Sequence, residues 1–317
     1  MDRAWAEART DEKHSPEEIK DQLNNYRQVE QAISPYLKEL SQLWQGIIFG
    51  SRREVIRKKD GPFQHGADLN VVEAIRQWPE IASGQHDMAR VMDKMVREEV
   101  LVKTPELIRL RIVADLSGSM TKDRRKVLKE TVVLLLSSLR EFNAQLNMNR
   151  AHTKTKLTVD TELWGFGSEA KVLKPFKDEL KGRDDQLAII QAVEGLDFEG
   201  GSTSDHHALE GILESLTDQE KRDIDLKKTM EIVFEITDGG SDLPVRAKAA
   251  VDTLSEKGII IRSFQVGTVS KDETEKFNSV WNINRAQPFG EAIGREIENL
   301  IPAVKDALRK YLGNIRL

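Results

Sequence analysis

The feature that most constrains the fold is a regular alternation of short apolar segments and longer amphipathic ones, which begins near residue 107 and continues towards the end of the chain. Short runs rich in Leu, Ile and Val predict strands, and apolar residues at helical spacing predict helices. Strands are expected at 107–114, 157–166, 170–175, 230–237 and 259–266, and helices at 122–142, 185–196, 205–216, 243–257 and 290–311. This order predicts an α/β domain over residues 105–317, built on a doubly wound, mainly parallel sheet covered on both faces.

The first 104 residues have a different pattern, which predicts a helical N-terminal accessory region. Ser15–Glu18 is typical of a helix start, because a serine cap is followed by proline in the first turn and then by acidic residues. Apolar residues then recur at helical spacing, and Pro35 predicts that a second helix begins there. A further short helix is expected at 69–77, and one more within 82–103.

A basic segment follows the first helices, and its pattern predicts a hairpin over residues 53–64 that turns at Asp60-Gly61. Its positive charge comes from five residues: Arg52, Arg53, Arg57, Lys58 and Lys59. A solvated hairpin surface is one interpretation of this charge. Docking to an acidic protein surface is the other, since complementary charge aids encounter and register.

Composition narrows the function classes. The chain has no cysteine, which excludes disulfides, thiolate metal ligands and thiol nucleophiles and fits a reducing compartment. The formal net charge is −5, which argues against nucleic-acid binding because phosphate neutralisation needs clustered Lys and Arg. No apolar run approaches the roughly 20 residues that span a bilayer, and the first residues do not resemble a signal peptide. We therefore expect a cytoplasmic protein with no membrane or nucleic-acid partner.

Three short polar loops carry the candidate site. They span Asp115–Ser119, Gly200–Asp205 and Thr237–Gly240, and the first and third stand at the ends of predicted strands. Ligands of open α/β sheets bind beyond the carboxyl ends of the strands, so the three loops are expected to converge there. Together they offer carboxylate and hydroxyl oxygens, the ligands that a hard cation such as Mg²⁺ prefers. Each loop alone also fits an ordinary helix cap or turn, and their joint occurrence favours a metal site.

At these loops the sequence resembles the von Willebrand factor A family and its metal-ion-dependent adhesion site. The family pattern is Asp-x-Ser-x-Ser, then a distant Thr, then a later Asp, and the matching residues are Asp115, Ser117, Ser119, Thr203 and Asp238. The resemblance implies that the serines, and sometimes the threonine, bind Mg²⁺ or Mn²⁺ directly, with the aspartates acting largely through water. It also implies a protein-binding module and not an enzyme, in which a partner Asp or Glu fills an open position on the metal.

The region before the domain resembles a narrower group. Helical residues, then Gly66–Asn70 and Met95–Glu98, precede the first strand in a layout similar to midasin and to the cobaltochelatase subunit that bears this domain. That resemblance implies partnership with an AAA+ ATPase ring of the MoxR or chelatase type, in protein remodelling or in metal or cofactor insertion. A stand-alone Mg²⁺-dependent adhesion or scaffold module without an ATPase is the alternative.

Other patterns compete with this interpretation. Gly165–Ala170 matches a dinucleotide-binding fingerprint, but strand residues follow where a helix is needed, so a turn between two strands is expected. An aspartyl-nucleophile phosphohydrolase would need a second acid two residues after Asp115, where Ser117 stands. His206 and His207 suggest zinc, yet adjacent helical residues point apart and no further His or Cys lies at ligand spacing. No phosphate-binding loop motif occurs, and no enzymatic activity is expected.

Overall fold

The structure is a computed structural model of the 317-residue chain, and it describes residues 16–50, 54–66, 68–84, 89–100, 105–149, 157–177, 185–197, 201–283 and 288–312. Contacts between Cα atoms divide the chain into two compact units. Of the described residues, unit 1 comprises 16–48 and 105–312, and unit 2 comprises the described residues from 49 to 100. No helix in the described part of the chain combines the length and apolar character needed to cross a membrane.

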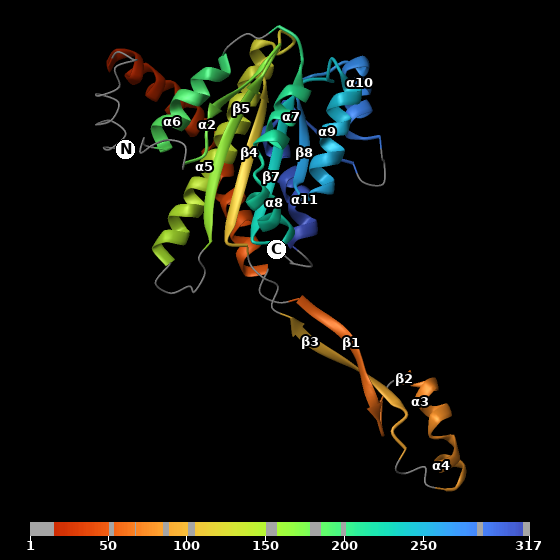
Figure 1. Ribbon diagram of the computed structural model, residues 1–317. Helices are drawn as coiled ribbons and strands as arrows, with labels where there is room; N and C mark the ends of the chain where they lie inside the picture. Colours follow the sequence, from red (N-terminus) through yellow and green to blue (C-terminus); the bar gives the residue numbers. More distant parts are fainter. Residues whose placement is uncertain are drawn as a thin grey trace. The chain divides into compact units, whose positions relative to one another are not determined.

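Unit 1 is built on a six-stranded sheet with the strand order β6-β5-β4-β7-β8-β9 (Figure 1). The strands are β4 (Leu107–Asp115), β5 (Thr158–Phe166), β6 (Ala170–Lys174), β7 (Thr229–Thr237), β8 (Ile260–Val266) and β9 (Gly290–Gly294). Neighbouring strands are parallel except β6, which runs antiparallel to β5 at one edge. The chain goes from β4 to β5 on one side and later returns to the other side of β4 for β7. The strand order therefore reverses between β4 and β7.

Helices cover both faces of this sheet (Figure 1), so nearly every residue of its central strands is buried. On one face, apolar side chains of α7 (Asp205–Ser215), α8 (Asp218–Asp225), α9 (Pro244–Glu256) and α10 (Lys271–Trp281) form a common core with those of the sheet. The other face is covered by α5 (Lys122–Asn149) and α11 (Leu300–Leu312), with α6 (Asp185–Glu194) beside α5. Single 3-10 turns lie at Gly195–Asp197 and Ile297–Asn299. The predicted α/β class with a mainly parallel sheet is confirmed.

The N-terminal helix α2 is one continuous element, Pro16–Gly50, so the predicted pair of helices is wrong. Pro35 lies inside it, and the apolar stripe keeps the same phase on both sides of this proline. The buried side chains of the stripe are Ile19, Leu23, Tyr26, Ile33, Leu40, Leu43 and Trp44. An internal proline costs about 3 kcal/mol, but burying each large apolar side chain contributes about 1.5–3 kcal/mol. The stripe packs on α5, where Trp44 Nε1 donates to the Ser138 hydroxyl at 2.9 Å, so packing keeps the helix continuous.

Unit 2 holds a three-stranded sheet in the order β1-β3-β2. β1 (Glu54–Phe63) pairs antiparallel with β3 (Met92–Val100), and the short β2 (Asp68–Leu69) pairs antiparallel with the other side of β3. Two short helices, α3 (Val71–Arg76) and α4 (Trp78–Ala82), follow β2. The short helix predicted in this region is thus confirmed as α3.

Two predictions in unit 2 are wrong. Residues 53–64 do not form a hairpin, and the helix expected within 82–103 is replaced by β3. Asp60 and Gly61 do not turn the chain, because they fall where the β1–β3 register shifts between Asp60 and Phe63. Pairing between segments about 40 residues apart outweighs the local turn signal, as strand formation depends strongly on context. Of the basic residues, the following lie outside the described part: Arg52, Arg53 and the side chains of Arg57, Lys58 and Lys59.

The end of unit 1 also differs from the prediction. The single helix expected over 290–311 is a strand followed by a helix, because residues 290–294 pair with β8 and complete the sheet as β9. Helices α8 and α10 were not predicted, although both begin with capping boxes that the sequence contains, Thr217 with Glu220 and Ser270 with Glu273. The other predicted strands and helices of the domain are confirmed, with shifted ends.

Candidate metal centre

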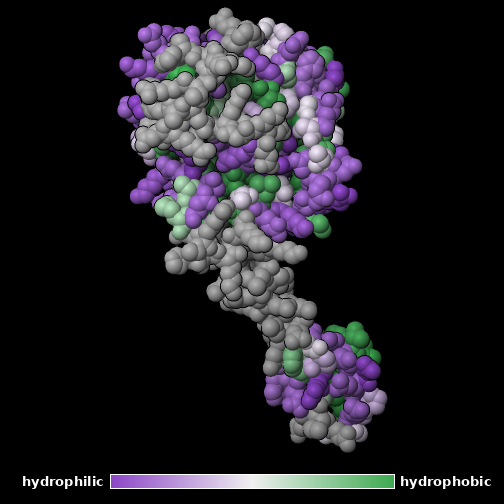
Figure 2. All heavy atoms as spheres, turned by 60° about the vertical axis from the view of Figure 1, so that its left-hand side comes forward, coloured by the Kyte–Doolittle hydropathy of each residue, from purple (hydrophilic) through white to green (hydrophobic). Residues whose placement is uncertain are grey.

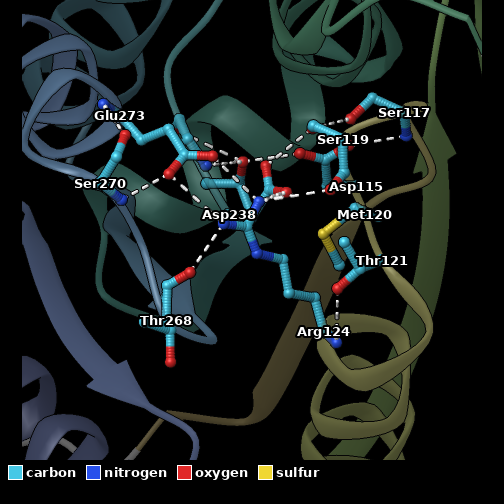
Figure 3. Close-up of polar contacts among 12 residues, drawn as sticks. Asp115, Ser117, Ser119, Met120, Thr121, Arg124, Asp238, Thr268, Ser270 and Glu273 are labelled. Atoms are coloured by element: carbon cyan, nitrogen blue, oxygen red, sulfur yellow. Dashed lines mark hydrogen bonds and ion pairs between the residues drawn. The ribbon is translucent and has the colours of Figure 1, made fainter.

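Two acidic residues stand at adjacent strand ends on the carboxyl edge of the sheet. Asp115 is the last residue of β4, and Asp238 directly follows β7. These strands are neighbours at the point where the strand order reverses, which is where open α/β sheets form a ligand crevice. Both aspartates are buried. Figure 3 shows their carboxylates close to the loop that follows β4.

Hydrogen bonds join four of the five predicted residues. The Ser117 N–H donates to Asp115 Oδ1 at 2.8 Å. The hydroxyl oxygens of Ser117 and Ser119 lie 2.9 Å apart, and Ser119 Oγ donates to Asp238 Oδ1 at 2.9 Å. A serine hydroxyl has one proton, and that of Ser119 is used on Asp238, so Ser117 is the donor to Ser119. Both hydroxyl oxygens therefore keep lone pairs that could bind a cation.

Thr203, the fifth predicted residue, is placed through its backbone. Its N–H donates to Asp242 Oδ2 at 2.8 Å, and its carbonyl accepts from the Asp242 N–H at 2.9 Å. The Gly118 N–H donates to the Gly201 carbonyl at 3.1 Å, which ties the second loop to the first. In the described residues no hydrogen bond joins the Thr203 hydroxyl to the other four side chains. The structure thus brings the loop of Thr203 to the site through backbone hydrogen bonds; Gly200 lies outside the described residues.

The charge on Asp115 is poorly compensated. Its carboxylate accepts from the Ser117 N–H and, at 2.7 Å, from the Thr237 hydroxyl. Burial raises the pKa of Asp115 to about 6, and the negative charge of Asp238 acts in the same direction. The hydrogen bonds lower this pKa but do not reverse the effect, since both donors are neutral.

Two further carboxyls, neither of them in the predicted set of metal-site residues, are buried in the same region: Asp205 at the start of α7 and Glu235 on β7. Burial raises the pKa of Asp205 to about 7, although hydrogen bonds from the Ser241 side chain and the His206 N–H act to lower this pKa. Burial, and next the charges of Asp205 and Asp115, hold the pKa of Glu235 well above its usual range. A cation in this region would reduce the cost of these buried negative charges.

The donor set fits an oxygen-ligated divalent cation. Among the described residues no three His, Cys, Asp or Glu side chains are grouped as metal ligands, so an ion here would need the serine hydroxyls besides the two carboxylates. Such oxygen donors suit Mg²⁺ or Mn²⁺ better than zinc, which favours nitrogen and sulfur. No basic side chain in the described residues pairs with Asp115. A cation would supply the positive charge that this carboxylate lacks.

Comparison with known proteins identifies the fold family. A family model described as von Willebrand factor type A domain matches residues 110–289, which is more than half of the chain. The chain belongs to the von Willebrand factor A family. An uncharacterised protein of Treponema pallidum is 26% identical over 281 residues, which cover 87% of this chain and 46% of the relative. The chain therefore spans about half the length of the curated relative that it matches.

Several solved structures are similar to the chain. The manganese-loaded TRAP protein of Plasmodium vivax has a TM-score of 0.45 at 14% identity, over 66% of this chain and 75% of that one. Proximal thread matrix protein 1 from the mussel byssus, with a zinc-occupied MIDAS motif, has a TM-score of 0.42 at 15% identity, and the match covers 65% of this chain and 46% of that one. The conserved hypothetical protein BatB from Bacteroides thetaiotaomicron has a TM-score of 0.38 at 15% identity, and the match covers 64% of this chain and 98% of that one.

Arg124 is the main residue of the VWA site that the sequence reasoning missed. Its Nη1 donates to Asp238 Oδ2 at 2.5 Å and to Glu273 Oε1 at 3.0 Å. Arg124 lies in the first turn of α5 and Glu273 in the first turn of α10, so two helices meet at the third loop (Figure 3). The capping box at Glu273 was visible in the sequence, but its contact with a residue 149 positions away was not.

The competing patterns find no support as separate sites. Gly165–Ala170 spans the turn between antiparallel β5 and β6, which confirms that it is not a dinucleotide-binding loop. The rings of His206 and His207 lie 4.2 Å apart, and no third ligand accompanies them in the described part of the VWA domain. Both ring nitrogens of His206 are buried with no hydrogen-bond partner, and burial lowers the pKa of this histidine.

Proposed function

We propose that this VWA domain is a divalent-metal-dependent protein-binding module and not an enzyme. The metal would be Mg²⁺ or Mn²⁺, and its site would be formed by Asp115, Ser117, Ser119, Thr203 and Asp238. The observation that carries the proposal is the connected set of side chains from Asp115 to Asp238 at the reversal point of the sheet. The domain would span residues 105–317, preceded by an accessory region whose helix α2 packs on α5.

The chain's own residues explain how such a site would bind a partner. Asp238 accepts a hydrogen bond from the Ser119 hydroxyl, and Ser119 accepts one from Ser117, so both hydroxyl oxygens keep lone pairs that these bonds do not use. Asp115 fixes the loop by accepting the Ser117 N–H. A bound Mg²⁺ supplies positive charge, and neutral hydroxyl ligands leave much of that charge uncompensated. A carboxylate from a partner would then gain a strong, charge-assisted contact.

The partner that we propose is an acidic segment of another protein, and more specifically one belonging to an AAA+ ATPase ring. The support for the ATPase is the resemblance of Gly66–Asn70 and Met95–Glu98 to midasin and to the VWA subunit of cobaltochelatase. A stand-alone adhesion or scaffold module would use the same metal site with another acidic partner. Reconstitution with a MoxR-type ATPase separates the two, because only the first predicts a metal-dependent complex with such an ATPase.

The experiment that tests the module itself measures partner binding with Mg²⁺ and with EDTA, for the wild type and for Ser119→Ala. Ser202→Ala is the matched control, because Ser202 lies in the second loop but bonds to Ser168 and Ser204 instead of to the aspartates. Loss of one charge-assisted contact at an interface centre costs about 2–5 kcal/mol, or roughly 30-fold to several-thousand-fold in affinity. EDTA and Ser119→Ala should each produce such a loss, and Ser202→Ala should not. Binding that survives both would contradict the proposal.

A further inference from the structure

Arg124 is held more firmly than an ordinary surface arginine. Its side chain is 13% exposed, and its guanidinium makes five hydrogen bonds. Nη1 donates to Asp238 Oδ2 at 2.5 Å, to Glu273 Oε1 at 3.0 Å and to the Ser119 carbonyl at 3.3 Å. Nη2 donates to the Thr268 carbonyl at 2.7 Å and to Glu273 Oε2 at 3.3 Å. So many acceptors fix the guanidinium in one position beside Asp238 (Figure 3).

The backbone around the site makes room for this arrangement. Gly267, directly after β8, has a φ of +82°, and a Cβ atom there would lie 2.6 Å from Arg124 Cγ. Gly240, two residues after Asp238, lies against the backbone of α10, where a Cβ atom would lie 2.7 Å from the carbonyl carbon of Lys276. A side chain at either glycine would push Arg124 or α10 away. Gly267 therefore lets Arg124 pack against the chain after β8, and Gly240 lets the loop that carries Asp238 pack against α10.

The two aspartates of the centre consequently differ in charge compensation. Asp115 accepts hydrogen bonds from neutral donors, whereas Asp238 has the Arg124 guanidinium as a counter-ion. A divalent cation that used Asp238 would meet the positive charge of Arg124 at the same carboxylate. Like charges a few ångströms apart repel strongly where water is largely excluded. Metal and arginine would compete for one carboxylate.

We infer that Arg124 is a resident counter-ion of Asp238 that sets the affinity of the site for divalent metal and couples the site to helix α10. The inference rests on the proposed function, since it assumes that metal binds at this centre. Metal binding weakens the pair between Arg124 and Asp238, and Arg124 then depends more on Glu273. Glu273 also caps α10, because its Oε2 accepts the Ser270 N–H at 2.5 Å. The first turn of α10 therefore responds to the metal.

The first test compares the Mn²⁺ affinity of the full chain by calorimetry for the wild type, Arg124→Met and Arg125→Met. Methionine keeps an unbranched apolar stem and removes the charge. Arg125 lies in the same helix turn, but its Nε donates to the Met120 carbonyl at 2.7 Å, so its substitution controls for net charge. Arg124→Met should bind Mn²⁺ roughly tenfold or more tightly, because a charge adjacent to the metal is removed. Arg125→Met should stay within about threefold of the wild type, because charges at partly exposed positions are screened.

The second test adds Glu273→Gln, alone and together with Arg124→Met. Glutamine can still serve the capping box of α10. It removes the negative charge of Glu273, however, so that Asp238 is the one carboxylate that still accepts a hydrogen bond from Arg124. Mn²⁺ affinity should therefore fall, by roughly threefold, in Glu273→Gln and should be unaffected by the same change when Arg124 is already methionine. Hydrogen exchange in residues 271–274 should change on Mn²⁺ addition in the wild type and not in Arg124→Met.

Each outcome decides the inference. Equal Mn²⁺ affinities of the wild type and Arg124→Met would overturn it and leave the proposed metal site standing. An effect of Glu273→Gln that persists in the Arg124→Met background would overturn the coupling. Binding of Mn²⁺ by Arg124→Met alone would support the inference, because the arginine then keeps metal out. Lack of binding in both would overturn the proposed function and this inference together. Arg124→Gln takes the place of the methionine variant if that variant does not fold.

Discussion

Replacing Asp115 with asparagine removes a buried negative charge at the end of β4 and keeps nearly the same side-chain shape. The asparagine carbonyl can still accept the Ser117 N–H, which lies 2.8 Å from Asp115 Oδ1. The Thr237 hydroxyl now donates to Asp115 Oδ2 at 2.7 Å and accepts the Gly239 N–H at 3.2 Å, and it can rotate to accept from the new amide. The substitution therefore changes the charge far more than the packing.

The pKa of Asp115 gives the expected magnitude. Burial, reinforced by the charge of Asp238, raises it from 3.8 to about 6. One pKa unit corresponds to about 1.4 kcal/mol, so the ionised carboxylate costs the metal-free fold about 3 kcal/mol near neutral pH. Metal-free Asp115→Asn should accordingly be more stable than the wild type by about 2–3 kcal/mol and melt roughly 4 °C or more above it.

Urea and thermal unfolding, each in EDTA and in excess MgCl₂, measure this prediction. The wild type should gain about 2.7 kcal/mol when Mg²⁺ is at about a hundred times its Kd, whereas Asp115→Asn should gain little. The pH dependence has a definite sign, because the folded pKa lies above the unfolded value. The destabilisation of the fold by ionised Asp115 is present above about pH 6 and disappears as the pH falls towards 4, since Asp115 takes up its proton at a higher pH in the folded state than in the unfolded state. In EDTA the difference between the two proteins should narrow over that window.

Asp123, exposed in the first turn of α5, is the matched control. Asp123→Asn should change the unfolding free energy by no more than about 0.5 kcal/mol and leave the Mg²⁺ effect intact. If Asp115→Asn were less stable than the wild type in EDTA, the charge argument would be refuted. If it gained as much from Mg²⁺ as the wild type, Asp115 would not belong to a metal site.

Three further predictions concern packing, a buried ion network and catalysis. Trp44→Ala should lower the unfolding free energy, measured in urea, by about 3–5 kcal/mol, because this buried ring anchors α2 on α5. Arg111→Met should cost about 3–5 kcal/mol, because it leaves the buried carboxylates of Glu162 and Glu231 without the arginine that bonds them at 2.7 and 2.6 Å; replacing both glutamates by glutamine should restore much of the loss. The purified chain should hydrolyse neither nucleotides nor phosphate esters, and turnover that disappears in Ser117→Ala would contradict this.

The sequence by itself determined the sheet domain and pointed to four residues that the structure joins by hydrogen bonds in the candidate centre. Parallel strands covered on both faces are rich in apolar residues, so β4, β7 and β8 are visible as segments dominated by Leu, Ile, Val and Phe, although each also carries charged or polar residues. The polar residues that end β4 and β7 are visible because each begins a loop rich in Asp, Ser, Thr and Gly residues, Asp115–Ser119 and Thr237–Gly240. The carboxyl ends of parallel strands lie at one edge, so the strand pattern places Asp115 and Asp238 on the same edge, and the strand order of the structure makes them neighbours.

Other features of the chain were decided by contacts between distant residues. Local signals at Pro35 and Asp60 predicted breaks, yet packing on α5 keeps α2 continuous, and pairing with β3 keeps β1 one strand, with a register shift at the turn signal. Residues 290–294 have no strand pattern of their own and become β9 because β8 offers an unpaired edge. Each of these outcomes depends on a partner segment that local periodicity does not contain.

The charge balance of the candidate centre was also decided by contacts between distant residues. Candidate oxygen ligands can be proposed from residue types in order, but a counter-ion cannot, because Arg124 reaches Asp238 from α5 and Glu273 contacts Arg124 from α10. The buried charge of Asp205 is equally invisible, since its raised pKa arises from desolvation and from Asp115, not from its neighbours in sequence. Burial and electrostatic compensation are properties of the assembled fold, and only the tertiary structure determines them.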